Sequence, residues 1–408
     1  MATLKGSIAG HPDFELGIPR TVPVEYRAEV PENGPADGLV FIVPGFGGDK
    51  DEALLTLTRR HIAATYNLVA VSVRPHCYHC RPSSMLPKGV DVNIEIDPWS
   101  IARAIGALVL QGDDLSGLTS AEQSATLPFL KSRWEHAFEL KGTIIPPGDD
   151  YQNFGVLAAL DHLMVLADLR KRDVAFENSN VICLGTSHGG YISHLIHKFA
   201  PNTVSAVIEC SAYLQFMPNY VGFGAADELH SIDGNITLVS ATRSAWQMER
   251  AGAPDYFGTD AMMIREVALP SHQAVLSKAA PDRALQCRML HSLKDRLVPI
   301  ELKRGYLSVL RAFDHDVQLD EMGEAELDGK FITTLEHGMG VSLAKLFDRF
   351  YPSLQPSKGA ADADLGTRLN YPCGVQNYVV QHGAEGPVAE RVAWNAEATG
   401  GPNATATK

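Results

Sequence analysis

Ser187 lies in the segment ICLGTSHGGY, residues 182–191, where Gly185 and Gly189 flank it in the pattern G-x-S-x-G. An apolar run precedes this segment and a helical pattern follows it. A sharp turn between a strand and a helix holds a serine hydroxyl clear of its own backbone, at the positive end of the helix. Glycine and serine are frequent enough here for the motif to arise by chance, so the context must decide whether Ser187 is a nucleophile.

A serine hydroxyl is a poor nucleophile by itself. It needs a base that takes its proton, which is usually a histidine, and a third group that holds the base and stabilises its charge. The sequence must therefore supply a histidine and a carboxylate elsewhere in the chain.

With the Ser187 segment in this context, the chain resembles the α/β-hydrolase superfamily over about residues 22–350. Members carry a triad in the order serine, acid, histidine along the chain. The resemblance implies that Asp295, in KDRLVPIE after an apolar run, is the acid. It implies that His337, in a glycine-containing loop between a strand-like run and an amphipathic segment, is the base.

The resemblance also implies an oxyanion hole made of two backbone N–H groups. VPGFGGD, residues 43–49, follows the first long apolar run and is similar to the loop that lends one of them. By position, the donors are the amides of Phe46 and His188, the residue after the nucleophile.

Other interpretations of these residues remain open. Glu209 competes with Asp295 as the acid, because some members of the superfamily carry the carboxylate after the next strand. Asp295 alone could cap a helix, and His337 alone could be a loop histidine bonded to backbone. His194 and His197, three positions apart, favour a solvated or packed helix face over a metal pair.

Five short apolar runs alternate with longer helical patterns, and each run is apolar on nearly every residue. Strands buried on both faces have this composition. We therefore expect an α/β fold with a mostly parallel central sheet and helices on both faces. The runs are residues 38–45, 67–74, 180–187, 204–213 and 285–293. Helices are expected at 151–170, at 301–313 and after Asp49, the last with Leu54, Leu57, Thr58 and Ile62 on one stripe.

The main domain is expected to span residues 1–355 and to contain an insertion at residues 75–150. This insertion is too long for a simple connection and carries two helical patterns, so we interpret it as a lid. One stripe contains Ile101, Ile105, Leu108 and Val109; the other follows a capping box of Thr119 and Glu122 and contains Phe129, Leu130, Trp134 and Phe138. Residues 356–408 form a C-terminal extension, with a hairpin from VQNYVVQ and VAERVAW and a frayed end.

The substrate pocket is expected to include Tyr213, Phe216 and Trp134, although aromatic residues at such spacing more often pack a core. We expect a serine hydrolase that cleaves a carboxylic ester through an acyl-enzyme. An amidase, peptidase, thioesterase or acyltransferase on the same triad is the alternative within enzymes. A binding protein that retains the fold without the chemistry is the alternative outside them.

Composition limits the partners. The chain has 45% hydrophobic residues and a formal net charge of −13, which argue for a globular protein and against nucleic acid or an anionic membrane surface. The amino terminus has no apolar signal region, so we expect a cytoplasmic protein with a small-molecule partner. Homo-oligomer formation stays open. We expect no cofactor, since His76, Cys77, His79 and Cys80 resemble half of a zinc site that no second cluster completes.

Overall fold

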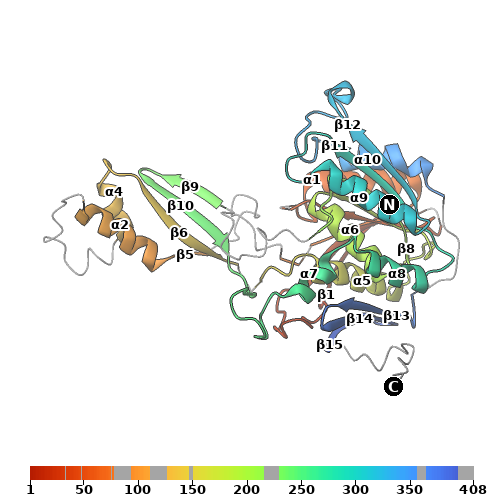
Figure 1. Cartoon of the computed structure of the whole chain (residues 1–408). Coiled ribbons are helices and arrows are strands. Elements are labelled where there is room, and N and C mark those ends of the chain that lie inside the picture. The colour runs from red at the N-terminus through yellow and green to blue at the C-terminus, as the bar shows by residue number, and fades with distance from the viewer. Residues whose placement is uncertain are drawn as a thin grey trace, which may run out of the picture. The chain divides into compact units, whose positions relative to one another are not determined.

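The computed structural model describes residues 1–32, 34–46, 48–74, 76–77, 93–110, 126–146, 150–215, 229–355 and 364–393. The chain divides into two compact units. Figure 1 shows its helices and strands, with colours that follow the residue number. Unit 1 consists of Met1–Pro75, Gly155–Phe216 and Phe257–Lys408, and unit 2 of His76–Phe154 and Met217–Tyr256. Within the described residues, no helix is long and apolar enough to cross a bilayer.

Unit 1 contains an eight-stranded mixed sheet in the order β1-β2-β4-β3-β7-β8-β11-β12. Five neighbouring pairs, from β4 to β12, are parallel. The pairs β1·β2 and β2·β4 are antiparallel, so one edge departs from the expected parallel arrangement. The strands are β1 (Ala2–Ile8), β2 (Val24–Val30), β3 (Leu39–Val43), β4 (Val69–Val73), β7 (Val181–Thr186), β8 (Val204–Cys210), β11 (Gln286–Ser292) and β12 (Asp316–Met322).

The five apolar runs of the sequence form β3, β4, β7, β8 and β11. The first four of these strands are buried at all or nearly all positions, as expected for strands covered on both faces. β1, β2 and β12 were not predicted, since they alternate between buried and exposed residues or lie at the edge.

Helices cover both faces of this sheet, which confirms the expected layers. α1 (Ala53–Tyr66) and α10 (Leu343–Phe350) pack on one face and on each other. α5 (Val156–Lys171), α6 (His188–Phe199) and α9 (Ile300–Ala312) lie on the other face. Unit 1 also contains α7 (Thr259–Arg265) and α8 (Pro270–Ala279).

The expected apolar stripe of α1 was wrong in part. Leu54 and Leu57 are 76% and 61% exposed, whereas Leu55, Thr58 and Ile62 are buried. The sequence offers leucines on both sides of this helix, and packing against α10 and the sheet selects Leu55 for the core. Helical spacing alone does not identify which of two overlapping stripes is buried.

The described part of unit 2 has a four-stranded sheet in the order β5-β6-β10-β9 and the helices α2 and α4. Its core includes Ala104 and Leu108 of α2, Leu130 of α4 and Phe138 and Leu140 of β6. β9 and β10 come from the second segment, which the sequence analysis did not join to the insertion. The elements are β5 (Asn93–Ile96), α2 (Pro98–Leu110), α4 (Thr126–Ser132), β6 (Phe138–Ile145), β9 (Leu229–Asp233) and β10 (Ile236–Thr242).

The second predicted helix of the insertion ends early. α4 stops at Ser132, Trp134 lies in the following turn, and Phe138 begins β6. Phe138, Leu140 and Ile144 are buried on alternate positions, which is the spacing of a strand. Trp134 is 80% exposed. Ile101 and Leu108 lie on α2 as expected, whereas Thr119, Glu122 and the side chain of Val109 lie outside the described residues. The lid role stays a prediction.

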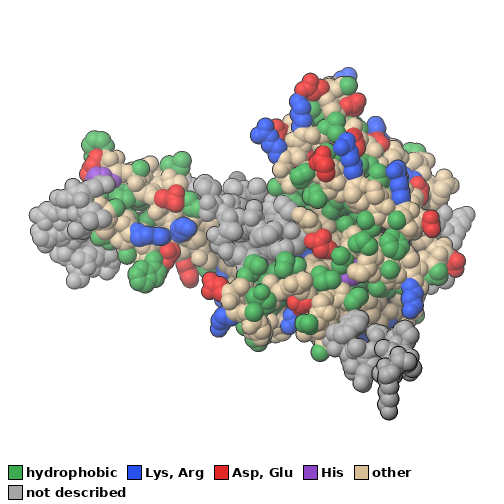
Figure 2. Space-filling model, in the orientation of Figure 1, with side chains coloured by type: hydrophobic (Ala, Val, Ile, Leu, Met, Phe, Trp, Pro, Cys, Tyr) green, Lys and Arg blue, Asp and Glu red, His purple; other side chains and the backbone are tan. Residues whose placement is uncertain are grey.

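The two alternating segments near the C-terminus form β14 (Gln376–Gly383) and β15 (Gly386–Ala393), which pair antiparallel. A third strand, β13 (Arg368–Cys373), completes this sheet. The sheet packs against α5, α7 and α8. Glu15 and Arg265 form a buried ion pair, and Tyr378 of β14 donates to the same carboxylate, which fixes this sheet to the rest of unit 1. On the face shown in Figure 2, acidic and basic side chains are mixed over the surface.

Candidate active site

Ser187 lies in the turn between β7 and α6, as the motif predicts. Its φ angle is 54°, a left-handed conformation that non-glycine residues adopt rarely and that often occurs at functional sites. Its backbone N–H donates to Cys210 O at 2.8 Å, which ties the turn to the end of β8.

Glycines permit this turn because the backbones around it approach closely. A Cβ atom on Gly185 would lie 2.5 Å from the carbonyl group of Gly189. A Cβ atom on Gly189 would lie 2.2 Å from Val43 O. Both glycines of the motif are therefore required by close packing, and the second brings the loop after β3 next to Ser187.

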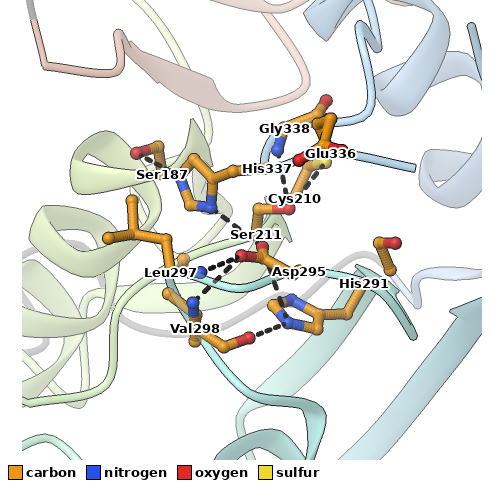
Figure 3. A network of polar contacts seen from close by, with 12 residues as sticks. Ser187, Cys210, Ser211, His291, Asp295, Leu297, Val298, Glu336, His337 and Gly338 are labelled. Atoms are coloured by element: carbon orange, nitrogen blue, oxygen red, sulfur yellow. Dashed lines mark hydrogen bonds and ion pairs between the residues drawn. The ribbon is translucent and has the colours of Figure 1, made fainter. Parts of the chain in front are cut away.

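The structure brings together the three residues that the resemblance implied, although they come from three distant parts of the chain (Figure 3). The Nε2 atom of His337 lies 2.8 Å from Ser187 Oγ. The Nδ1 atom of His337 lies 2.8 Å from Asp295 Oδ2. A carboxylate only accepts hydrogen bonds, so Nδ1 carries a proton and Nε2 is left to accept from the serine hydroxyl.

Asp295 is held in its turn by backbone groups. Its Oδ1 atom accepts from Leu297 N–H and Val298 N–H, both at 2.9 Å, and its side chain has no exposed surface. Burial acts to raise its pKa, but the hydrogen bonds from His337 and Val298 outweigh burial and hold the pKa below its ordinary value. Asp295 is therefore an anion placed to face His337.

His291 is a further neighbour of this carboxylate that the sequence analysis missed. Its Nε2 atom donates to Val298 O at 2.7 Å and lies 3.7 Å from Asp295 Oδ2. Burial, followed by the charge of Lys303, lowers the pKa of His291. A neutral His291 at this place adds packing and a dipole next to Asp295 without a positive charge of its own.

Glu209, the competing acid, is engaged elsewhere. Its Oε1 atom lies 2.5 Å from Lys303 Nζ, and its Oε2 atom accepts from Ala212 N–H at 2.8 Å. Among the described residues, no hydrogen bond joins Glu209 to His337. The geometry therefore favours Asp295 as the partner of the imidazole.

The two residues expected to form the oxyanion hole lie side by side. His188 is the first residue of α6, and Phe46 lies in the loop between β3 and α1. Their rings meet edge to face, with 5.9 Å between centroids. The start of α6 also places the positive end of a helix dipole at Ser187. That both backbone amides bind an oxyanion stays a prediction.

The expected pocket residues have different surroundings. The Tyr213 ring stacks on the His337 ring, with 5.7 Å between centroids and 24° between planes, and only 2% of Tyr213 is exposed. Phe216 lies outside the described residues. Trp134 belongs to unit 2 and is exposed there. Their contact with substrate stays a prediction.

The remaining histidines of the sequence analysis are packed. His194 contacts the Tyr306 hydroxyl, and burial lowers the pKa of His197 to about 3. In unit 2, Cys77 Sγ lies 2.8 Å from Tyr151 O and His76 Nδ1 lies 3.6 Å from Asp150. His79 and Cys80 lie outside the described residues, and the described part of the chain contains no group of metal ligands.

One family model, described as "Protein of unknown function (DUF2920)", matches residues 5–385. The chain belongs to this family. The comparison with curated proteins found no match.

Several solved structures are similar to the chain, all at low identity. Est1E from Butyrivibrio proteoclasticus with bound ferulic acid has 13% identity and a TM-score of 0.40, over 84% of this chain and 98% of that chain. Pyrococcus horikoshii acylaminoacyl peptidase has 12% identity and a TM-score of 0.43, over 89% of this chain and 43% of that chain. Thermogutta terrifontis esterase 2 has 10% identity and a TM-score of 0.41, over 83% of this chain and 92% of that chain. Because identities and TM-scores are this low, we infer the function from the geometry of the site.

Proposed function

We propose that this protein is a serine hydrolase that cleaves a carboxylic ester through an acyl-enzyme intermediate. The observation that carries the proposal is the pair of 2.8 Å contacts that joins Ser187, His337 and Asp295 in one line. A turn serine or a loop histidine without a chemical role needs neither contact. The strained backbone of Ser187 at the start of α6 supports the same role.

In the proposed reaction, Ser187 Oγ bonds to the carbonyl carbon while its proton passes to His337 Nε2. Asp295 stabilises the imidazolium that forms, and the amides of Phe46 and His188 receive the negative oxygen. Collapse of this intermediate breaks the ester bond, and the leaving alkoxide takes the proton from His337. Water then attacks the acyl-enzyme, His337 accepts its proton, and the acid leaves as Ser187 recovers its hydrogen.

Labelling with a fluorophosphonate probe tests the nucleophile. We expect one equivalent of label on the full-length chain, mapped by mass spectrometry to Ser187, and none on Ser187→Ala. The same substitution should lower kcat by about 10³-fold or more on 4-nitrophenyl acetate, because a triad acts as a unit. Folded wild-type protein that stays unlabelled would support the binding-protein alternative instead.

Turnover of matched ester, thioester and amide substrates tests the leaving group. We expect the ester to be hydrolysed with the highest kcat/KM. A preference for the amide would identify an amidase or peptidase. Faster release of product when an alcohol or amine is added would identify an acyltransferase.

A further inference from the structure

The loop that carries His337 has little regular structure of its own. Between the end of β12 at Met322 and the start of α10 at Leu343, it contains one short 3-10 helix, Glu324–Glu326. The strand-like run that the sequence suggested before His337 is an irregular segment. The imidazole must nevertheless meet Ser187 and Asp295 within hydrogen-bond distance, so contacts from other elements have to fix the loop.

Two buried serines hold this loop on either side of His337. Ser211 Oγ accepts from Gly338 N–H at 3.1 Å. Ser292 Oγ donates to Leu335 O at 2.6 Å. Both serines are fully buried, and each follows or ends a central strand of the sheet. Figure 3 shows the contact between Ser211 and Gly338 beside the imidazole.

The last residue of β8 and the residues after it make two more contacts with the same loop. Cys210 Sγ lies 3.7 Å from Gly338 O, a weak hydrogen bond. The Tyr213 ring covers one face of the His337 ring. Ser211, Cys210 and Tyr213 therefore fix the backbone after His337 and the plane of its imidazole together.

The turn that supplies these contacts is itself anchored. Ser211 has a φ angle of 53°, and its N–H donates to Leu290 O at 3.1 Å. Ala212 N–H donates to Glu209, whose carboxylate is paired with Lys303. A non-glycine residue in this conformation costs free energy and persists where its surroundings determine it strongly. The buried carboxylate that competes with Asp295 in the sequence is thus part of a support for the base.

We propose that the turn Glu209–Tyr213 is a positioning device for the base, in which Ser211 holds the His337 loop and Tyr213 holds the imidazole plane. This inference rests on the proposed function. Ser211 and Tyr213 act through His337, so their loss should lower the rate of the chemical step more than it weakens substrate binding.

The test compares Ser211→Ala, Ser211→Gly and Ser205→Ala, with 4-nitrophenyl acetate as substrate. Both Ser211 variants lose the hydroxyl, but glycine adopts a positive φ without strain, so the Gly variant stays folded if the Ala variant does not. Ser205, at the other end of β8, is the matched control. It is buried, and its hydroxyl donates to Val181 O at 3.1 Å, far from the His337 loop in the strand.

We expect both Ser211 variants to lower kcat about tenfold with little change in KM, because small displacements of a catalytic group are costly. Tyr213→Leu should have an effect in the same direction. Ser205→Ala should keep the wild-type kcat. Proton NMR adds a signature: the downfield resonance of the His337 Nδ1 proton that faces Asp295 should shift or broaden in the Ser211 variants and persist in Ser205→Ala.

Wild-type values of kcat and an unchanged resonance in Ser211→Gly would overturn the positioning role, as would an equal loss of kcat in Ser205→Ala. The labelling of wild-type Ser187 separates this failure from failure of the proposed function. If wild-type protein labels at Ser187 and the Ser211 variants keep kcat, the proposed function stands and the positioning role does not. If Ser187 does not label, both are wrong.

Discussion

Glu209 and Lys303 form an ion pair in the interior of unit 1, with 2.5 Å between Oε1 and Nζ and no exposed surface on either side chain. A buried charge without its partner is costly, typically about 3–5 kcal/mol in the free energy of unfolding. This pair therefore stabilises the interior of unit 1 in addition to anchoring the turn Glu209–Tyr213.

Glu209→Gln and Asp295→Asn should consequently differ in what they lose. Glu209→Gln leaves Lys303 charged and unpaired and should lower the free energy of unfolding by about 3 kcal/mol. Asp295→Asn should lower kcat by about 10⁴-fold, since the amide cannot hold the imidazolium. Urea unfolding and steady-state kinetics on both variants provide the comparison. A larger loss of kcat in folded Glu209→Gln than in Asp295→Asn would contradict the assignment of the acid.

Stability at acid pH should depend on Asp295. Its pKa in the folded state lies below the ordinary value of about 3.9 in an unfolded chain. The stabilisation is therefore fully present above that value and is lost as the pH falls through the folded-state pKa. The difference in unfolding free energy between wild-type protein and Asp295→Asn should be constant near neutral pH and should shrink below about pH 4. A difference that grows on acidification would contradict the lowered pKa.

Gly189→Ala should disturb the proposed oxyanion hole. The added Cβ would lie within 2.3 Å of the backbone oxygens of Val43 and Pro44, so the loop that carries Phe46 must move. Loss of one donor to an oxyanion typically lowers kcat by about 10²–10³-fold. Gly305→Ala is the control, because its Cβ meets no atom within 4 Å on helix α9. We expect unchanged kinetics and equal or higher stability for Gly305→Ala. Equal kcat values of the two variants would contradict a role of the Phe46 loop in binding the oxyanion.

The interpretation of unit 2 as a lid is tested at Trp134. Trp134→Ala removes an exposed ring without opening a core, whereas Phe138 is part of the core of unit 2 and its loss would destabilise the unit. If this unit selects substrates, kcat/KM should change unequally among short and long acyl esters, by about 1–3 kcal/mol per lost apolar contact. Trp99 lies on α2 and is as exposed as Trp134. Trp99→Ala therefore shows whether a change in the chain-length profile is specific to the surface around Trp134. An unchanged chain-length profile in both variants would mean that unit 2 does not select the acyl chain.

The three residues of the candidate site were predictable because each is defined by local order. Ser187 and Asp295 follow buried strands and precede helices, and such segments can be recognised from apolar runs and glycine or proline alone. His337 was singled out by its glycine-containing loop before an amphipathic helix, and the structure places it within hydrogen-bond distance of Ser187 and Asp295. The strand-like run expected before it is an irregular segment.

The supports of the site were not predictable in the same way. Ser211 and Ser292 act through contacts with the His337 loop, which lies far along the chain, and a serine near the end of a strand has no pattern that predicts such a contact. His291 lies only four positions before Asp295, and its contact depends on how the turn after β11 folds. Phe138 was misassigned for a related reason, since its spacing from Phe129 and Trp134 fits a helix as well as its spacing from Leu140 fits a strand. Tertiary pairing with β10 selects the strand.

Unit 2 is assembled from two segments separated by one segment of the other unit, Gly155–Phe216. Its strands β6 and β10 are parallel neighbours, and the Asn235 side chain contacts Leu130 O across 105 positions of sequence. While the ribosome synthesises the intervening residues, which include Ser187, β6 has one edge without its eventual partner. Parallel strands that are far apart in the sequence pair slowly during folding, and an unpaired strand edge can pair with strands of other chains. We therefore expect that a nascent chain released before residue 236 associates with chaperones or aggregates, and that the sheet of unit 2 is completed only after β7 and Ser187 have been synthesised.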